Sequence, residues 1–142
     1  MNTLTVDEIA HIKRTWRLLR HVDPALLGEV FYEYLFIQYP NLRRLFTGSM
    51  NSQYQKFVDM LNTIVVGIDR SAEVLTEIKQ MGQRHATYGV KPSHYEAVGD
   101  AFLWTLERGL GKDWNADVRN AWSSYYQLIT QLMLEPQGER LN

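Results

Sequence analysis

The stretch "MGQRHATYGVKPSHY", residues 81–95, contains the feature that bears most strongly on the fold. His85 stands seven residues before Pro92, at the end of an apolar helical pattern. Met81 and Tyr88 share its helical face, because residues four and three positions apart are neighbours on a helix. A histidine that faces an apolar interior needs partners for its ring nitrogens. A hydrogen-bonded core histidine and a metal ligand are both consistent with this pattern.

The composition limits the classes of function. A chain of 142 residues fits one domain of ordinary size, and its formal net charge of -1 gives no reason to expect a nucleic acid or an anionic membrane as partner. The absence of cysteine excludes disulfides, thiolate metal sites and a cysteine nucleophile, and it is compatible with a reducing compartment. No apolar run approaches the length of a membrane span. We therefore expect a soluble, cytoplasmic protein.

Helical periodicity predicts an all-α domain with six substantial helices, and no alternating strand pattern is found. The first helix is expected at a capping box from Thr5 to Glu8, and the fifth at a second capping box from Ser93 to Glu96. The other helices are expected at 24–39, 52–68, from about 71 through His85, and at 118–134, with a short helical turn at 40–45. We expect one domain over residues 1–135 and a flexible tail at 136–142.

Motifs for common catalytic chemistry are missing, including Gly-rich phosphate loops, H-E-x-x-H and G-x-S-x-G. His11 and His21 are expected on the solvated surface, and His94 at a helix start has a capping or surface role. The segment "GEVFYEYLFIQYPNLRRLF" places Tyr32, Pro40 and Phe46 at successive offsets of eight and six.

Together these features resemble the globin family, in particular bacterial single-domain haemoglobins and the globin part of flavohaemoglobins. Family patterns "FYxxLF", "RHxxYGV", "HYxxVG" and "AWxxxY" are echoed in order at 31–36, 84–90, 94–99 and 121–126. The resemblance implies a globin fold of six to eight helices packed around a pocket for haem b.

The resemblance also assigns roles to single residues. His85 would be the iron ligand, Phe46 would pack on the haem face, and Tyr32 would overlook the gas ligand. Gln53, 32 positions before His85, would be the distal polar residue. Phe57, one helical turn after Gln53, would face the same pocket.

Further residues are implied on either side of the haem. Phe46, Phe57 and Met81 would form an apolar wall, and Lys56 would pair with a haem propionate. Tyr95 falls at the tyrosine position of the flavohaemoglobin proximal network, whereas the glutamate position falls on Gln137, with Glu135 two residues away.

Three of these residues have ordinary alternatives. Tyr32 fits a core aromatic residue whose hydroxyl finds a backbone partner, and Gln53 and Lys56 fit solvated helix positions. The function expected from the resemblance is reversible binding of dioxygen, nitric oxide and carbon monoxide at a pentacoordinate haem iron. The alternatives are a nitric oxide dioxygenase that works with a separate reductase, and a gas or redox sensor that acts through a partner.

Overall fold

The structure is a computed structural model that describes residues 4–69, 71–87 and 89–134. The expected tail at 136–142, together with Tyr88, Glu135 and Gln137, lies outside the described residues. The described chain forms six α-helices and three short 3-10 helices, and no β-strand. Their bounds are α1 (Val6–Leu19), α2 (Pro24–Gln38), η1 (Pro40–Leu45), α3 (Met50–Val66), η2 (Gly67–Asp69), α4 (Ser71–Thr87), α5 (His94–Leu110), η3 (Gly111–Asp113) and α6 (Ala116–Met133).

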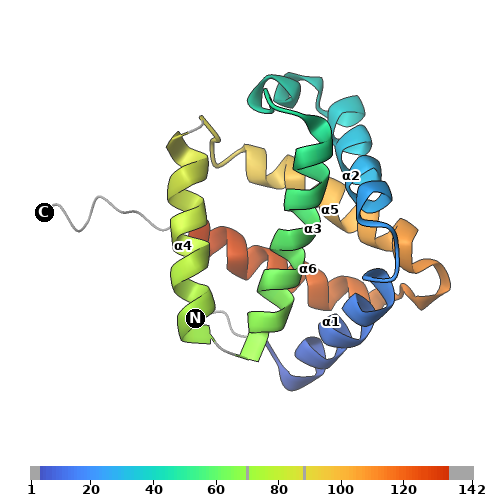
Figure 1. Cartoon of the computed structure of the whole chain (residues 1–142). Coiled ribbons are helices and arrows are strands. Elements are labelled where there is room, and N and C mark those ends of the chain that lie inside the picture. The colour runs from blue at the N-terminus through green and yellow to red at the C-terminus, as the bar shows by residue number, and fades with distance from the viewer. Residues whose placement is uncertain (1–3, 70, 88, 135–142) are drawn as a thin grey trace, which may run out of the picture.

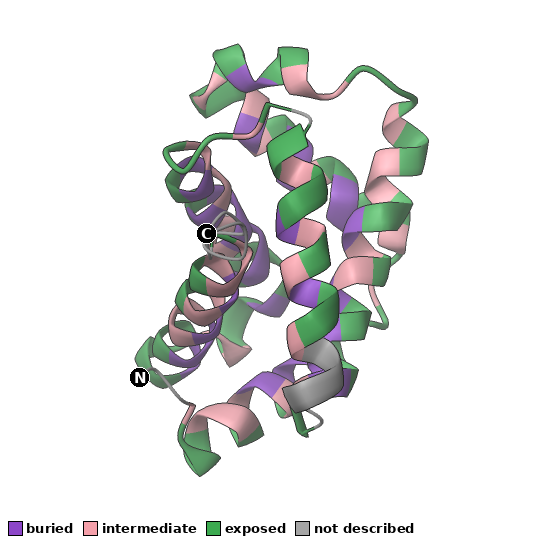
Figure 2. Cartoon of the chain, turned by 90° about the vertical axis from the view of Figure 1, so that its left-hand side faces the viewer, coloured by how far each residue is buried: buried purple, intermediate pink, exposed green. Residues whose placement is uncertain are grey.

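The predicted all-α class is thus confirmed, and the helices cross one another at steep angles rather than running as a parallel bundle (Figure 1). In Figure 1, α4 and α3 both run upright in the view, α4 at the left and α3 apart from it in the middle, and α6 crosses behind them. Buried positions lie on the inward sides of the helices, around a common interior (Figure 2). Among the described helices, none combines the length and the apolar character needed to cross a membrane.

One of the two predicted capping boxes forms. The Thr5 N–H donates to Glu8 Oε1 at 2.9 Å and the Glu8 N–H donates to Thr5 Oγ1 at 3.0 Å, so α1 begins as expected. The predicted box at Ser93 is wrong, because Ser93 has a helical backbone (φ -63°, ψ -25°) and its side chain makes no cap hydrogen bond. Instead the Lys91 N–H donates to Nδ1 of His94 at 3.0 Å, so the ring of His94 caps this turn.

The third α-helix begins earlier than predicted. Ser49 has an extended backbone and its hydroxyl accepts from the Ser52 N–H at 3.5 Å, so Ser49 is the N-cap and α3 starts at Met50. The helix ends at Val66 and the chain tightens into η2. Gln53 and Phe57 therefore lie in the first two turns of α3.

Hydrogen bonds from the large side chains of α6 attach this helix to its neighbours. Trp122 is fully buried, and its indole N–H donates to Thr15 Oγ1 of α1 at 2.9 Å. The Tyr125 hydroxyl donates to the Ile64 carbonyl of α3 at 2.6 Å. A buried donor without an acceptor is costly, so each bond selects one placement of α6 against its partner.

We predict that Thr15→Val lowers the free energy of unfolding by about 1 to 3 kcal/mol, because it leaves the indole N–H of Trp122 buried without an acceptor. Thr105→Val is the matched control. Thr105 is equally buried, but its hydroxyl only donates to the Ala101 carbonyl one turn earlier, so its loss should change stability by less than about 1 kcal/mol. Urea unfolding of both variants gives the comparison, and equal losses would contradict the role given to the Trp122 bond.

Candidate functional site

His85 lies in the last turn of α4, with its imidazole half-buried. Its Nδ1 is 2.7 Å from the carbonyl oxygen of Met81, one turn earlier in the helix. A carbonyl only accepts, so Nδ1 carries the proton and donates. In the neutral ring, Nε2 then holds a free lone pair, which is the donor atom that a metal needs.

The surroundings of His85 favour this neutral form. Burial lowers the pKa of His85, and the positive charge of Arg84 lowers it further, while the hydrogen bond to Met81 opposes them. A metal competes with the proton for an imidazole, so a lowered pKa keeps Nε2 available near neutral pH.

A second group of side chains gathers where α2 and α3 meet. The Tyr32 ring lies edge-on to Phe46, with centroids 5.2 Å apart, and edge-on to Phe57 at 6.2 Å. These rings belong to an aromatic cluster, which we define as Phe31, Tyr32, Phe36, Phe46, Tyr54 and Phe57. The structure thus brings together three of the predicted site residues from α2, α3 and the segment after η1.

The Tyr32 hydroxyl is a protonated donor. The residue is 7% exposed, and burial raises the pKa of its phenol to about 12, with a smaller contribution from Tyr54. No hydrogen bond to another described residue occupies this hydroxyl, which does not support the alternative of a backbone-satisfied core tyrosine. A neutral phenol of this kind can donate to a ligand placed beside the cluster.

Gln53 and Lys56 lie on α3 near the cluster. Gln53 is half-buried and lies one turn before Phe57, on the same helical face. Lys56 is exposed. Their positions are compatible both with the predicted site roles and with solvated helix positions, so both assignments remain predictions.

Tyr95 is buried at the start of α5, and burial raises the pKa of its phenol. Its carbonyl accepts a hydrogen bond from the Tyr126 hydroxyl of α6 at 2.6 Å, which holds this turn against α6. The carboxyl and amide partners considered for Tyr95, on Glu135 and Gln137, lie outside the described residues. The proximal network therefore remains a prediction.

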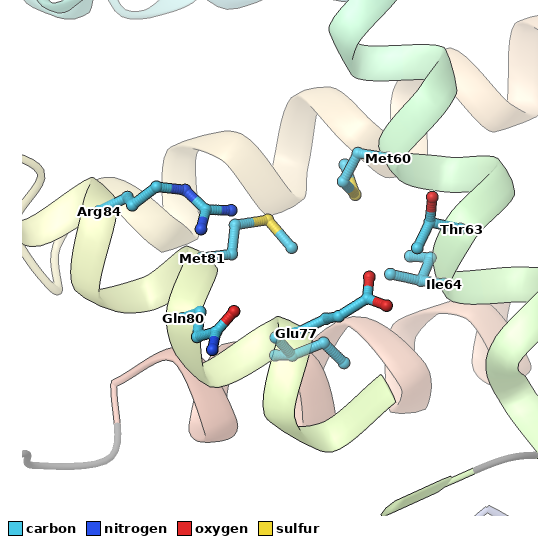
Figure 3. A pocket seen from close by; sticks show the side chains of 8 residues that line it. Met60, Thr63, Ile64, Glu77, Gln80, Met81 and Arg84 are labelled. Atoms are coloured by element: carbon cyan, nitrogen blue, oxygen red, sulfur yellow. The ribbon is translucent and has the colours of Figure 1, made fainter. Parts of the chain in front are cut away.

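A pocket of about 320 Å³ opens between α3 and α4 (Figure 3). Its lining residues are Met60, Thr63, Ile64, Glu77, Ile78, Gln80, Met81 and Arg84. The pocket reaches His85 through its neighbours Met81 and Arg84 but does not include the ring or the aromatic cluster. Of the three residues of the predicted apolar wall, Phe46 and Phe57 belong to the aromatic cluster and Met81 lines this pocket.

Sequence reasoning missed two features of this region. Tyr54 contacts the Tyr32 ring at 5.9 Å, and only the crossing of α2 and α3 brings it there. Arg84 belongs to the quoted "RHxxYGV" pattern, which could have directed attention to it.

Comparison with known proteins agrees with this geometry. The Globin family model matches residues 29–133, most of the chain. The chain belongs to the globin family.

The sequence relatives divide into long and short proteins. A flavohemoprotein of Vibrio cholerae is 27% identical over 138 residues, which cover 95% of this chain but 35% of that protein. An uncharacterized globin-like protein of Aquifex aeolicus is 28% identical over 131 residues, with 92% of both chains covered. This chain thus spans about a third of the length of the flavohemoproteins that it matches.

Solved structures of low sequence identity show the same fold. An engineered carbene transferase, described as a candidate nitric oxide dioxygenase from Rhodothermus marinus, has a TM-score of 0.85 at 23% identity and covers 98% of this chain and 96% of its own. A hexacoordinated heme protein from an anhydrobiotic tardigrade has a TM-score of 0.83 at 17% identity, with coverages of 93% and 94%.

Proposed function

We propose that this protein is a haem b protein that binds dioxygen, nitric oxide and carbon monoxide reversibly, with His85 as the protein ligand of the iron. The observation that carries the proposal is the half-buried His85 ring, whose Nδ1 donates to the Met81 carbonyl and whose Nε2 has no partner among the described residues. His85 would hold the haem, and the haem would supply a ferrous iron able to bind a diatomic gas. Membership of the globin family supports this cofactor.

We infer that the residues assigned to this site suit a planar, mostly apolar group with two carboxylates. We assign aromatic contact with this group to Phe46 and Phe57, and thioether contact to Met81. Lys56 on α3 and Arg84 in the pocket are the cations that we assign to the carboxylates. We assign Tyr95 to the His85 side of the site, supported by its burial at the start of α5.

The distal chemistry rests on the aromatic cluster. The packed rings around Tyr32 would make the space beside its hydroxyl poor in water, and in such a site a single hydrogen bond has a larger electrostatic effect. The Tyr32 phenol is neutral and has no hydrogen bond to another described residue, so we assign it as the donor to a polarised gas ligand. Gln53 is the second donor, weaker because its flexible amide can turn to solvent.

Replacing His85 with Ala should abolish stable haem retention, and added free imidazole should restore it, because the ring is the proposed axial ligand. His11→Ala is the control, since that half-buried ring pairs with Arg14 on α1 and should leave haem content unchanged. The Soret absorbance after gel filtration measures haem content. Full haem occupancy in His85→Ala with an unchanged iron-imidazole Raman stretch would refute the assignment.

Tyr32→Phe keeps the ring in the aromatic cluster and removes only the hydroxyl. Dioxygen should then dissociate about tenfold faster or more, because a hydrogen bond to the polarised ligand is worth roughly 1 to 3 kcal/mol, whereas carbon monoxide dissociation should change little. Gln53→Leu should act in the same direction with a smaller effect. Stopped-flow kinetics compares the variants, and the two roles must be exchanged if Gln53→Leu has the large effect and Tyr32→Phe stays within about twofold of the parent.

Nitric oxide dioxygenation is the second candidate function, favoured by the matches to flavohemoproteins, of which this chain covers about a third. This reaction combines nitric oxide and dioxygen into nitrate and needs electrons from a reductase, which we propose would be a separate protein. With a generic reductase and a reduced nicotinamide, we expect sustained nitric oxide consumption with nitrate formed in equal amount. Consumption that stops after one equivalent per haem, despite continued reduction, would leave reversible gas binding as the function.

A further inference from the structure

Gly82 lies buried where α4 crosses α6. A Cβ atom at this position would be 2.6 Å from the Met133 Cα and 2.7 Å from its carbonyl carbon, and it would also overlap the carbonyl oxygen. These are backbone atoms, which cannot rotate away as a side chain can. The spacing of α4 and α6 is therefore one that only glycine allows at residue 82.

This crossing is within one helical turn of the candidate iron ligand. Gly82 follows Met81, whose carbonyl holds the His85 ring, and it precedes His85 by three residues. One turn of helix moves as a unit. A change in the distance between α4 and α6 at Gly82 would therefore move both the His85 ring and the Met81 carbonyl that accepts from it. Other residues of the same turns, Met81 and Arg84, line the pocket that faces α3 (Figure 3).

We propose that Gly82 is a positioning residue for His85, and that the close α4–α6 contact it permits sets how far the imidazole projects toward α3. The inference rests on the proposed haem function, because the position of the ring matters only if Nε2 binds the iron. An added methyl group at residue 82 displaces α4 from α6 and carries the imidazole toward the site.

Gly28 provides a matched comparison at another helix crossing. A Cβ at Gly28 would lie 2.6 Å from both the Cα and the Cβ of Tyr54, so α2 and α3 also meet at a glycine. Gly28 lies one turn before Tyr32, and the Tyr54 ring contacts the Tyr32 ring. Alanine at residue 28 makes a collision of the same kind, but on the Tyr32 side of the site.

The experiment compares Gly82→Ala with Gly28→Ala, each as the full chain loaded with haem. Gly82→Ala should shift the iron-histidine Raman stretch of the ferrous protein and speed haem loss to an acceptor protein by about tenfold, which equals 1.4 kcal/mol. Gly28→Ala should leave that stretch in place and change dioxygen dissociation instead. An unshifted stretch in Gly82→Ala, or equal shifts in both variants, would overturn the proposal.

A tether test separates positioning through α4 from a general disturbance of the pocket. In His85→Gly protein supplied with free imidazole, the axial ring is no longer attached to α4. Adding Gly82→Ala to this background should then leave the iron-imidazole stretch unchanged. A shift that persists without the tether would show that Gly82 acts by another route.

Circular dichroism and thermal unfolding first establish that Gly82→Ala folds. If it does not, Ile129→Val provides the test, because Ile129 is buried one turn before Met133 on the same face of α6. Loss of one methyl group there loosens the contact without a collision, so a smaller shift of the same stretch is expected, and no shift would overturn the proposal. Failure of the parent protein to show a histidine-ligated haem spectrum would instead refute the proposed function, whatever the glycine variants do.

Discussion

An imidazole that is half removed from water loses hydration at both ring nitrogens, and within the described chain the structure compensates one of them. The Met81 carbonyl accepts from Nδ1 at 2.7 Å, which fixes the tautomer and the ring plane, and Nε2 has no partner in the part of the chain that the structure describes. Burial then lowers the pKa of His85, so the ring stays neutral and its free lone pair persists. The roles proposed for the other site residues all depend on this nitrogen as the iron ligand.

The two sides of the candidate site are built by different helix pairs. The aromatic cluster comes from α2, α3 and the segment after η1, whereas His85 comes from α4, which packs on α6. α6 connects the two sides. The Tyr125 hydroxyl of α6 donates to the Ile64 carbonyl of α3, and the Met133 backbone of α6 packs against Gly82 of α4. A change in α6 can therefore alter the width of the space between α3 and α4 without touching a site residue.

The relation to longer proteins bears on how such a site would be used. Flavohemoproteins match this chain over about a third of their length, and a globin-like protein of similar size matches nearly end to end. The proposed gas binding uses residues within the described fold, whereas a turnover reaction would also need a source of electrons. Whether the proposed site acts as a gas carrier or as an enzyme would thus depend more on a reductase partner than on the residues of the pocket.

The sequence by itself determined the all-α class, most helix bounds and the histidine on an apolar face, because these depend on local periodicity, capping and i, i+4 spacing. It failed at Ser93, where the backbone is helical and the serine cannot cap, and it placed the start of α3 two residues late because Ser49 was not recognised as the N-cap. Only the tertiary structure decided that Tyr54 joins Tyr32, that Arg84 lines a pocket with Met60, and that Gly82 meets the Met133 backbone. Those contacts join residues on different helices. Their distances depend on how the side chains of two crossing helices pack together and on where a glycine lets the backbones approach, and a local sequence pattern does not encode this packing.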